Sequence, residues 1–263
     1  MACNAAWFGS LRHLFGMLLC ACAITLTGCS TLHSARMWFP TSFGLEQVNP
    51  YLFVEPAISA EQRATLQRQI STGRAQLERF YGSLSATPYF VVCSSRACDL
   101  SFGSYGQRAA AYGDVAIRLG PTGWSAPIVA HEWSHAELYQ RAGGWWYARK
   151  IPRWFDEGLA VVVANEARHS DANWQEIQGQ GLAVPGLDEL RSFSDWGQAV
   201  AWYGEAAGDV PSNLHVVYTT AGQHMRAFIA CAGAAGVAGL LAALRIGSSF
   251  DDAYAAVSAN CAR

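Results

Sequence analysis

The run His131-Glu132-Trp133-Ser134-His135 constrains this chain more than any other part of its sequence. Residues four apart on an α-helix lie one turn apart and project from the same face. The two imidazoles can therefore bind one metal ion if the run is helical. Glu132 follows the first histidine, where its carboxylate can reach a metal-bound water without being a ligand. The motif predicts a helix with a metal-binding face; the alternative is two surface histidines on an ordinary helix.

A catalytic zinc site needs a third protein ligand and leaves its fourth position to water. The candidates are the acidic and imidazole side chains downstream of the motif: Asp156, Glu157, Glu166, His169, Glu205 and His215. Glu157 is the best of them, because it lies in a W-F-D-E-G-L-A run on the next expected helix. An antiparallel return of that helix would place Glu157 beneath the two histidines. Its apolar neighbours Phe155, Leu159 and Ala160 favour a buried position over a solvated one.

The hydrophobic pattern predicts helix and strands before the motif and only helices after it. Ser59 and Gln62 form a capping-box signature at the start of a long helix that Gly82 ends. Strands are expected at residues 50–56 and 89–93, and one or two more at 109–119, where Gly113-Asp114 breaks the segment. Ser125 is expected to cap the metal helix, which should stop at Gly143-Gly144.

The second half predicts a helix from Pro152 to about Arg168 and an irregular or short-helical stretch over residues 185–202. A helix opening at Pro211, a small-residue helix at 236–244 and a last helix at 250–257 follow. The expected fold is therefore α+β, with a sheet-containing lobe over residues 51–144 and an all-helical lobe over 145–263.

An export signal is expected at the N-terminus. Residues 11–27 form an apolar run with Arg12 near its start, and Leu26-Thr27-Gly28-Cys29 closes it. This end resembles the bacterial lipobox, which implies that residues 1–28 are removed and that Cys29 is diacylated. Ser30 follows instead of an aspartate, which favours the outer membrane, on its periplasmic side, in a Gram-negative cell. A plain cleaved signal and an uncleaved anchor are the alternatives, although the run is short for a membrane span. Residues 29–50 are expected to form a tether.

Four cysteines remain beyond the signal and Cys29: Cys93, Cys98, Cys231 and Cys261. An even number in an exported domain predicts two disulfides with three possible pairings. Proximity favours Cys93–Cys98 and Cys231–Cys261. A cysteine-based zinc site is disfavoured because there is no second close pair. The net charge of -2 argues against nucleic acid as a partner, which would need a basic face.

The H-E-x-x-H motif and the following Glu157-Gly158-Leu159-Ala160 resemble the gluzincin metallopeptidases, which include thermolysin and aminopeptidase N. The W-F-x-E-G run brings the chain closer to the peptidase MA-like proteins, and the match covers roughly residues 127–166. The resemblance implies a thermolysin-like domain that holds one Zn²⁺ through His131, His135 and Glu157. It implies that Glu132 is the general base for hydrolysis of a peptide or protein substrate by a zinc-bound water.

In that family a tyrosine or histidine of the helical lobe stabilises the oxyanion, and Tyr218 is the choice here. His215, His224 and Tyr203 are rivals, and Tyr218 can equally be a core aromatic. The edge strand that would pair with substrate is expected within residues 109–119.

Two departures from the family pattern bear on function. Val161 stands where thermolysin has an acidic residue, so an outer-shell carboxylate must be Asp156, Glu166 or another group. No G-x-M-E-N run precedes the motif, which favours an endopeptidase over an aminopeptidase. The alternative function is a catalytically silent lipoprotein that binds peptide or an envelope partner. A structural zinc protein is disfavoured, because two histidines and a glutamate leave an open position.

Overall fold

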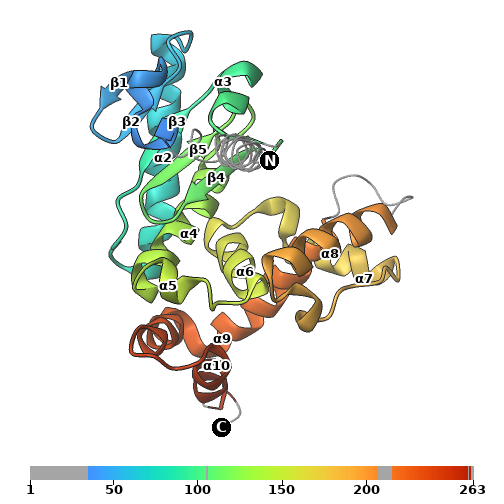
Figure 1. Cartoon of the computed structure of the whole chain (residues 1–263). Helices are drawn as coiled ribbons and strands as arrows, with labels where there is room; N and C mark the ends of the chain where they lie inside the picture. Colours follow the sequence, from blue (N-terminus) through green and yellow to red (C-terminus); the bar gives the residue numbers. More distant parts are fainter. Residues whose placement is uncertain (1–34, 105, 207–214, 260, 262–263) are drawn as a thin grey trace, which may run out of the picture.

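A small mixed sheet and a set of helices that surround the His131–His135 helix make up the fold (Figure 1). The computed structural model describes residues 35–104, 106–206, 215–259 and 261. The fold is α+β, as predicted, with all five strands before residue 120 and only helical elements after it. The expected export signal, with Leu26 to Cys29, lies outside the described residues.

The sheet has the strand order β1-β2-β3-β5-β4. The three inner strands are parallel and both edge strands run antiparallel to their neighbours. The strands are β1 (Glu46–Asn49), β2 (Leu52–Val54), β3 (Tyr89–Val92), β4 (Ala109–Tyr112) and β5 (Ala116–Leu119). β4 and β5 form a hairpin that turns at Gly113, whose φ of 59° suits glycine. One edge of β4 is consequently left open.

The first strand corrects the expectation of a tether over residues 29–50. Residues 46–49 pair with β2 as an edge strand, and Met37 and Leu45 are buried beside the sheet. A 3₁₀ helix, η1 (Pro40–Phe43), precedes this strand. Three of its four residues are exposed and only Val48 is half-buried, so hydrophobic patterning gives no strand signal.

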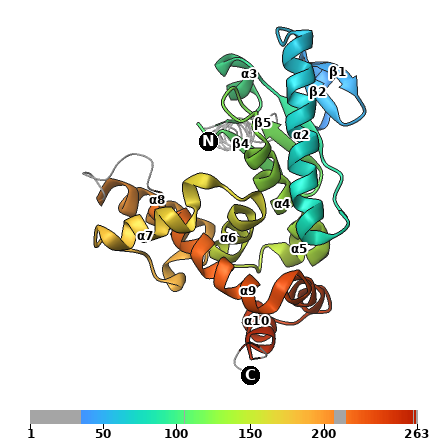
Figure 2. The same cartoon turned by 180° about the vertical axis from the view of Figure 1, so that it is seen from behind.

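The long helix predicted after Ser59 is α2 (Ala60–Tyr81), and its capping box is present. Helix α2 lies along α4 (Ala126–Ala142), the helix of the H-E-x-x-H motif, as Figure 2 shows from behind. Gly73 allows this close approach, because a Cβ atom there would lie 2.7 Å from Val129 Cγ1. Leu66 and Leu77 bury the same face of α2.

Helix α4 lies among β4, α2, α6 and α9, and most of its residues are buried. Ser125 occupies its N-cap position, but the serine hydroxyl caps no N–H group. The Oε1 atom of Gln69 accepts the N–H of Ala126 at 2.8 Å instead. Gly143, in the left-handed conformation, ends the helix as predicted.

Helix α6 (Arg153–Ala164) follows the short helix α5 (Trp145–Ala148) and packs against both α4 and α9. It ends four residues before the predicted end at about Arg168. Asn165 ends it in the left-handed conformation, which asparagine tolerates better than most residues. The chain then turns through η2 (Ala167–His169), and this turn brings Glu166 back toward α4.

The remaining elements are helical: α3 (Arg96–Ser101), α7 (Asp171–Gly179), η3 (Leu187–Leu190), α8 (Phe193–Ala206), α9 (Val216–Arg245) and α10 (Phe250–Ser258). The irregular or short-helical stretch predicted over residues 185–202 contains the short helix η3, but the prediction is wrong for α8, which is a regular helix of 14 residues. Ser192 and Asp195 cap its start by reciprocal hydrogen bonds of 2.9 and 3.0 Å. The expected helix start at Pro211 lies outside the described residues.

Helix α9 joins the two segments that were expected as separate helices, with non-helical backbone at Gly233 between them. Among the described residues it is the one helix whose length and composition would allow it to cross a membrane. Its first half packs on α6 through buried Ala221, Met225 and Phe228. Packing within the protein therefore explains much of the apolar character of that half.

Both predicted disulfides are present, Cys93–Cys98 and Cys231–Cys261, each with a Cα–Cα distance of 5.5 Å. The second joins α9 to the segment after α10. Two disulfides in a domain of this size are consistent with an oxidising compartment outside the cytoplasm.

Candidate metal centre

Helix α4 places the imidazoles of His131 and His135 side by side, with ring centroids 4.9 Å apart. Both Nε2 atoms point toward Glu157 on α6. The Oε2 atom of Glu157 lies 3.2 Å from His131 Nε2 and 3.6 Å from His135 Nε2. The three donor atoms lie within 4.8 Å of one another, and this group could hold a metal ion.

Two of the three separations between these donors match those of a tetrahedral metal site. Ligands at 2.0–2.1 Å from a tetrahedral zinc are separated from one another by roughly 3.4 Å. Both histidine–glutamate separations fall within about 0.2 Å of that value. Two neutral imidazoles and one carboxylate also form a donor set that zinc accepts, with three protein ligands and an open position.

The opposite nitrogen of each imidazole is held by a carboxylate. His131 Nδ1 lies 2.6 Å from Glu166 Oε1, and His135 Nδ1 lies 2.6 Å from Asp156 Oδ1. A carboxylate at Nδ1 favours a proton on that nitrogen, so that Nε2 would be the atom to bind a metal ion. Asp156 and Glu166, the two carboxylates that the sequence offers in place of an acid at Val161, therefore each contact one histidine of the group.

Arg153 joins the two carboxylates of α6, three and four residues before them. Its Nη1 donates to Asp156 Oδ2 at 2.6 Å, and its Nη2 donates to Glu157. Burial alone would raise the pKa of Glu157, but Arg153 and the two histidines hold that pKa well below its usual range. The sequence analysis missed Arg153, although i,i+3 and i,i+4 pairing on one helix would have indicated it.

Glu132 lies beside the three donors and lines the same cleft. Its carboxylate accepts a hydrogen bond from the backbone N–H of Ala111 on β4. Desolvation raises its pKa, and the neighbouring histidines oppose that rise. Glu132 is thus connected to β4, the open edge strand of the sheet.

Tyr218, on the first turn of α9, also lines the cleft. Its ring stacks on His169 at 5.3 Å and lies 6.4 Å from the ring of His131. Trp196 donates a hydrogen bond to the Tyr218 hydroxyl, whose own hydrogen remains available. The negative charge of Glu157, together with burial, raises the pKa of Tyr218, so the phenol stays protonated.

Of the rivals to Tyr218, only His215 lines this cleft. The hydroxyl of Tyr203 donates to Glu189, and His224 is exposed on α9. His169, a candidate third ligand by sequence, instead lies against Tyr218 with its Nδ1 3.3 Å from Thr219 Oγ1. Burial lowers the pKa of His169 to about 3, so this imidazole is neutral. The side chain of Glu205 lies outside the described part of the chain.

The cleft has a volume of about 650 Å³, and strand β4 forms one of its sides. Arg108 O accepts a hydrogen bond from Gly120 N. This bond fixes which residues of β4 direct their backbone N–H and C=O groups toward β5. The backbone groups of Ala109 and Ala111 therefore point away from β5 and into the cleft. Within residues 109–119, the segment predicted to pair with a substrate, β4 is the strand that turns free backbone groups toward the cleft.

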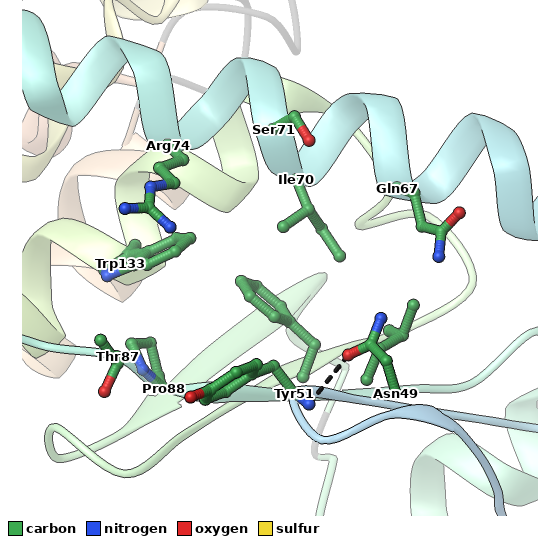
Figure 3. A pocket seen from close by; sticks show the side chains of 11 residues that line it. Asn49, Tyr51, Gln67, Ile70, Ser71, Arg74, Thr87, Pro88 and Trp133 are labelled. Atoms are coloured by element: carbon green, nitrogen blue, oxygen red, sulfur yellow. Dashed lines mark hydrogen bonds between the residues drawn. The ribbon is translucent and has the colours of Figure 1, made fainter.

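A second cavity, of about 430 Å³, lies on the other side of Trp133 between α2 and the sheet (Figure 3). Arg74 is the only charged side chain in its lining, and it is ion-paired with Glu78. The indole of Trp133 lines this cavity and donates to Ala86 O at 3.2 Å. This cavity holds no group suited to acid–base or metal chemistry.

No protein family model matches the chain, and neither does any curated protein or solved structure. The geometry of the site is therefore the basis for any assignment of function.

Proposed function

We propose that this chain is a zinc-dependent peptidase with a thermolysin-like catalytic domain. The observation that carries the proposal is the convergence of His131 Nε2, His135 Nε2 and Glu157 Oε2, with Glu132 beside them in an open cleft. Two disulfides, and the expected lipidation of Cys29, are in keeping with a protein anchored in a bacterial envelope.

His131, His135 and Glu157 would hold the zinc, and Glu166, Asp156 and Arg153 would orient those three ligands. A zinc ion bound there supplies a Lewis acid that acidifies water and polarises the substrate carbonyl. The outer hydrogen bonds fix each imidazole in one tautomer, so little reorganisation is needed when a metal binds.

The protein's own groups would share the remaining work. Glu132 takes a proton from the attacking water on its carboxylate and returns it to the leaving amine. Tyr218 donates its hydroxyl hydrogen to the developing oxyanion while Trp196 holds that hydroxyl in place. The N–H and C=O groups of Ala109 and the C=O group of Ala111 are offered to an extended peptide, which aligns the scissile bond with Glu132.

The test is hydrolysis of an unfolded protein, such as reduced and alkylated casein, by the zinc-loaded chain. Glu132→Gln should keep its zinc and lose at least about 100-fold in rate, because general acid–base catalysis is worth that much. The matched control is Glu176→Gln, which makes the same chemical change on the exposed face of α7 and should leave the rate unchanged. Equal rates for wild type and Glu132→Gln would overturn the proposal. Absence of hydrolysis by both, with zinc bound, would mean that the chain is a silent peptide-binding protein.

A further inference from the structure

Among the residues that the structure describes, one end of the cleft carries more positive than negative charge. Four acidic side chains of these residues line the cleft, and each one is hydrogen-bonded. Asp156 and Glu157 bind Arg153 and the histidines, and Glu166 binds His131 and Arg168. Glu132 is bound by Ala111 N–H. None of these carboxylates is paired with Arg108, which lines the cleft just before β4 begins.

Arg108 is exposed and its contacts are with a neutral group. Its Nε and Nη2 atoms donate to Thr122 O at 3.2 and 3.1 Å, and it has no carboxylate partner in the part of the chain that the structure describes. This contact holds the guanidinium in one place and leaves Nη1 free of any described partner. An arginine held in a cleft without a counterion is suited to bind an incoming carboxylate.

Arg168 lies at the same end. Its Nε donates to Glu166 Oε2 at 2.8 Å, while its two terminal nitrogens have no partner among the described residues. Burial and the positive charge of Arg168 lower the pKa of Arg108, and the negative charge of Glu166 opposes this effect. Both guanidinium groups therefore line the cleft within electrostatic range of each other and of the Glu166 carboxylate. Glu166 compensates only one of these two positive charges.

The position of the two arginines relative to β4 sets where a bound peptide would carry its charge. Arg108 precedes Ala111, the contact of Glu132, by three residues, or about 10 Å along a strand. A peptide that pairs antiparallel with β4 runs toward Arg108 at its C-terminal end, and antiparallel pairing is the slightly more stable choice. The group near the arginines would then lie two or three residues beyond the scissile bond.

We propose that Arg108 and Arg168 form an anion subsite that selects peptides with a carboxylate two or three residues after the bond to be cleaved. The cleavage of the bound peptide rests on the proposed peptidase function, but the preference for a carboxylate in binding does not require hydrolysis. The carboxylate is either an acidic side chain or the C-terminus of the peptide, because both present the same planar group to a guanidinium.

The test measures peptide binding to the zinc-loaded Glu132→Gln full chain by fluorescence anisotropy, so that no substrate is consumed. Three peptides are compared that differ only at one side chain and at the C-terminus. The first has an acidic side chain and an amidated C-terminus, and the second has the corresponding amide side chain and a free C-terminus. The third has the amide side chain and an amidated C-terminus, so it carries neither carboxylate. At least one of the two charged peptides should bind about tenfold more tightly than the uncharged one, as expected for a charge-assisted hydrogen bond. The charged peptide that gains affinity identifies the source of the carboxylate.

Arg108→Gln, added to Glu132→Gln, should abolish that preference, and Arg108→Lys should retain part of it. Arg68→Gln is the matched control, since it removes one positive charge from the exposed face of α2 and should leave the preference intact. Equal binding of all three peptides, or a preference that survives Arg108→Gln, would overturn the subsite. Failure of casein hydrolysis with the preference intact would overturn the peptidase proposal and leave the subsite standing.

Discussion

The Nδ1 atom of His131 lies 2.6 Å from the Oε1 atom of Glu166, although 35 residues separate them in sequence. The contact exists because α6 stops at Asn165 and the chain turns back toward α4. Glu166 is bound in turn by Arg168, so one carboxylate connects the candidate metal centre to the cationic end of the cleft.

Glu166 should act as a positioning residue for metal binding. Glu166→Ala should weaken zinc affinity by about 10- to 100-fold, because an outer-shell carboxylate fixes the orientation of its histidine. Competition with a chromogenic chelator measures the change, and Glu176→Ala on α7 provides a control of the same chemistry. Unchanged zinc affinity in Glu166→Ala would show that this contact does not support the site.

The glycine that follows Glu157 should be required for the packing of α6. A Cβ atom at Gly158 would lie 2.5 Å from Ala221 O on α9, and both helices would have to move apart. Gly158→Ala should therefore lower the free energy of unfolding by about 1–3 kcal/mol. Gly197→Ala on α8 meets nothing within 4 Å and should raise it by about 0.5–1 kcal/mol. Urea denaturation of both variants checks the prediction, which fails if the two substitutions change stability in the same direction.

The ion pair of Arg118 and Asp99 should be essential to the sheet edge that borders the cleft. Arg118, on β5, has no exposed surface and binds Asp99 on α3 and the carbonyl of Gln107 just before β4. Arg118→Ala should cost about 3–5 kcal/mol of stability, because it leaves the Asp99 carboxylate partly buried without its partner. The double variant with Asp99→Ala should recover part of this loss. A loss below about 1 kcal/mol in the single variant would contradict the assignment.

Glu55 should make the stability of the domain depend on pH. Burial raises the pKa of Glu55, but hydrogen bonds from Ser94 and Ser95 outweigh that effect and hold the pKa below its ordinary value of 4.5. A lowered pKa in the folded state means that the carboxylate stabilises the fold above about pH 4.5 and loses this effect as the pH falls. The stability difference between wild type and Glu55→Gln should therefore shrink from pH 7 to pH 3, as followed by urea denaturation. A difference that is constant over this range would show that the charge of Glu55 has no such role.

His131, His135 and Glu157 were predictable from the sequence because short sequence patterns identify them. The i,i+4 spacing of His131 and His135 requires a helix to be useful, and the W-F-D-E-G-L-A run identified Glu157 on the next helix. The four cysteines pair with their nearest neighbours in the sequence, at separations of 5 and 30 residues. Each of these predictions joins residues no more than 30 positions apart, although the short helix α5 lies between α4 and α6.

The parts that sequence reasoning missed depend on where elements meet. Strand β1 has a polar sequence, since the sheet and not the side chains holds it in place. The end of α6 depends on the backbone conformation of Asn165, and a helical pattern that continues past it conceals the stop. Arg108 and Arg168 lie 60 residues apart in sequence and line the same cleft because β4 and η2 both border it. No periodicity encodes such a meeting.

Metal stoichiometry tests the central claim most directly. The full chain, purified in the presence of zinc and then gel-filtered, should retain one zinc per chain, measured by plasma mass spectrometry. X-ray absorption should report nitrogen and oxygen ligands at about 2.0–2.1 Å and no sulfur ligand. His131→Ala and Glu157→Ala should each lose the metal, whereas His224→Ala, which alters an exposed histidine of α9, should retain it. A wild-type chain that holds no zinc, or variants at His131 and Glu157 that hold as much as wild type, would contradict the account.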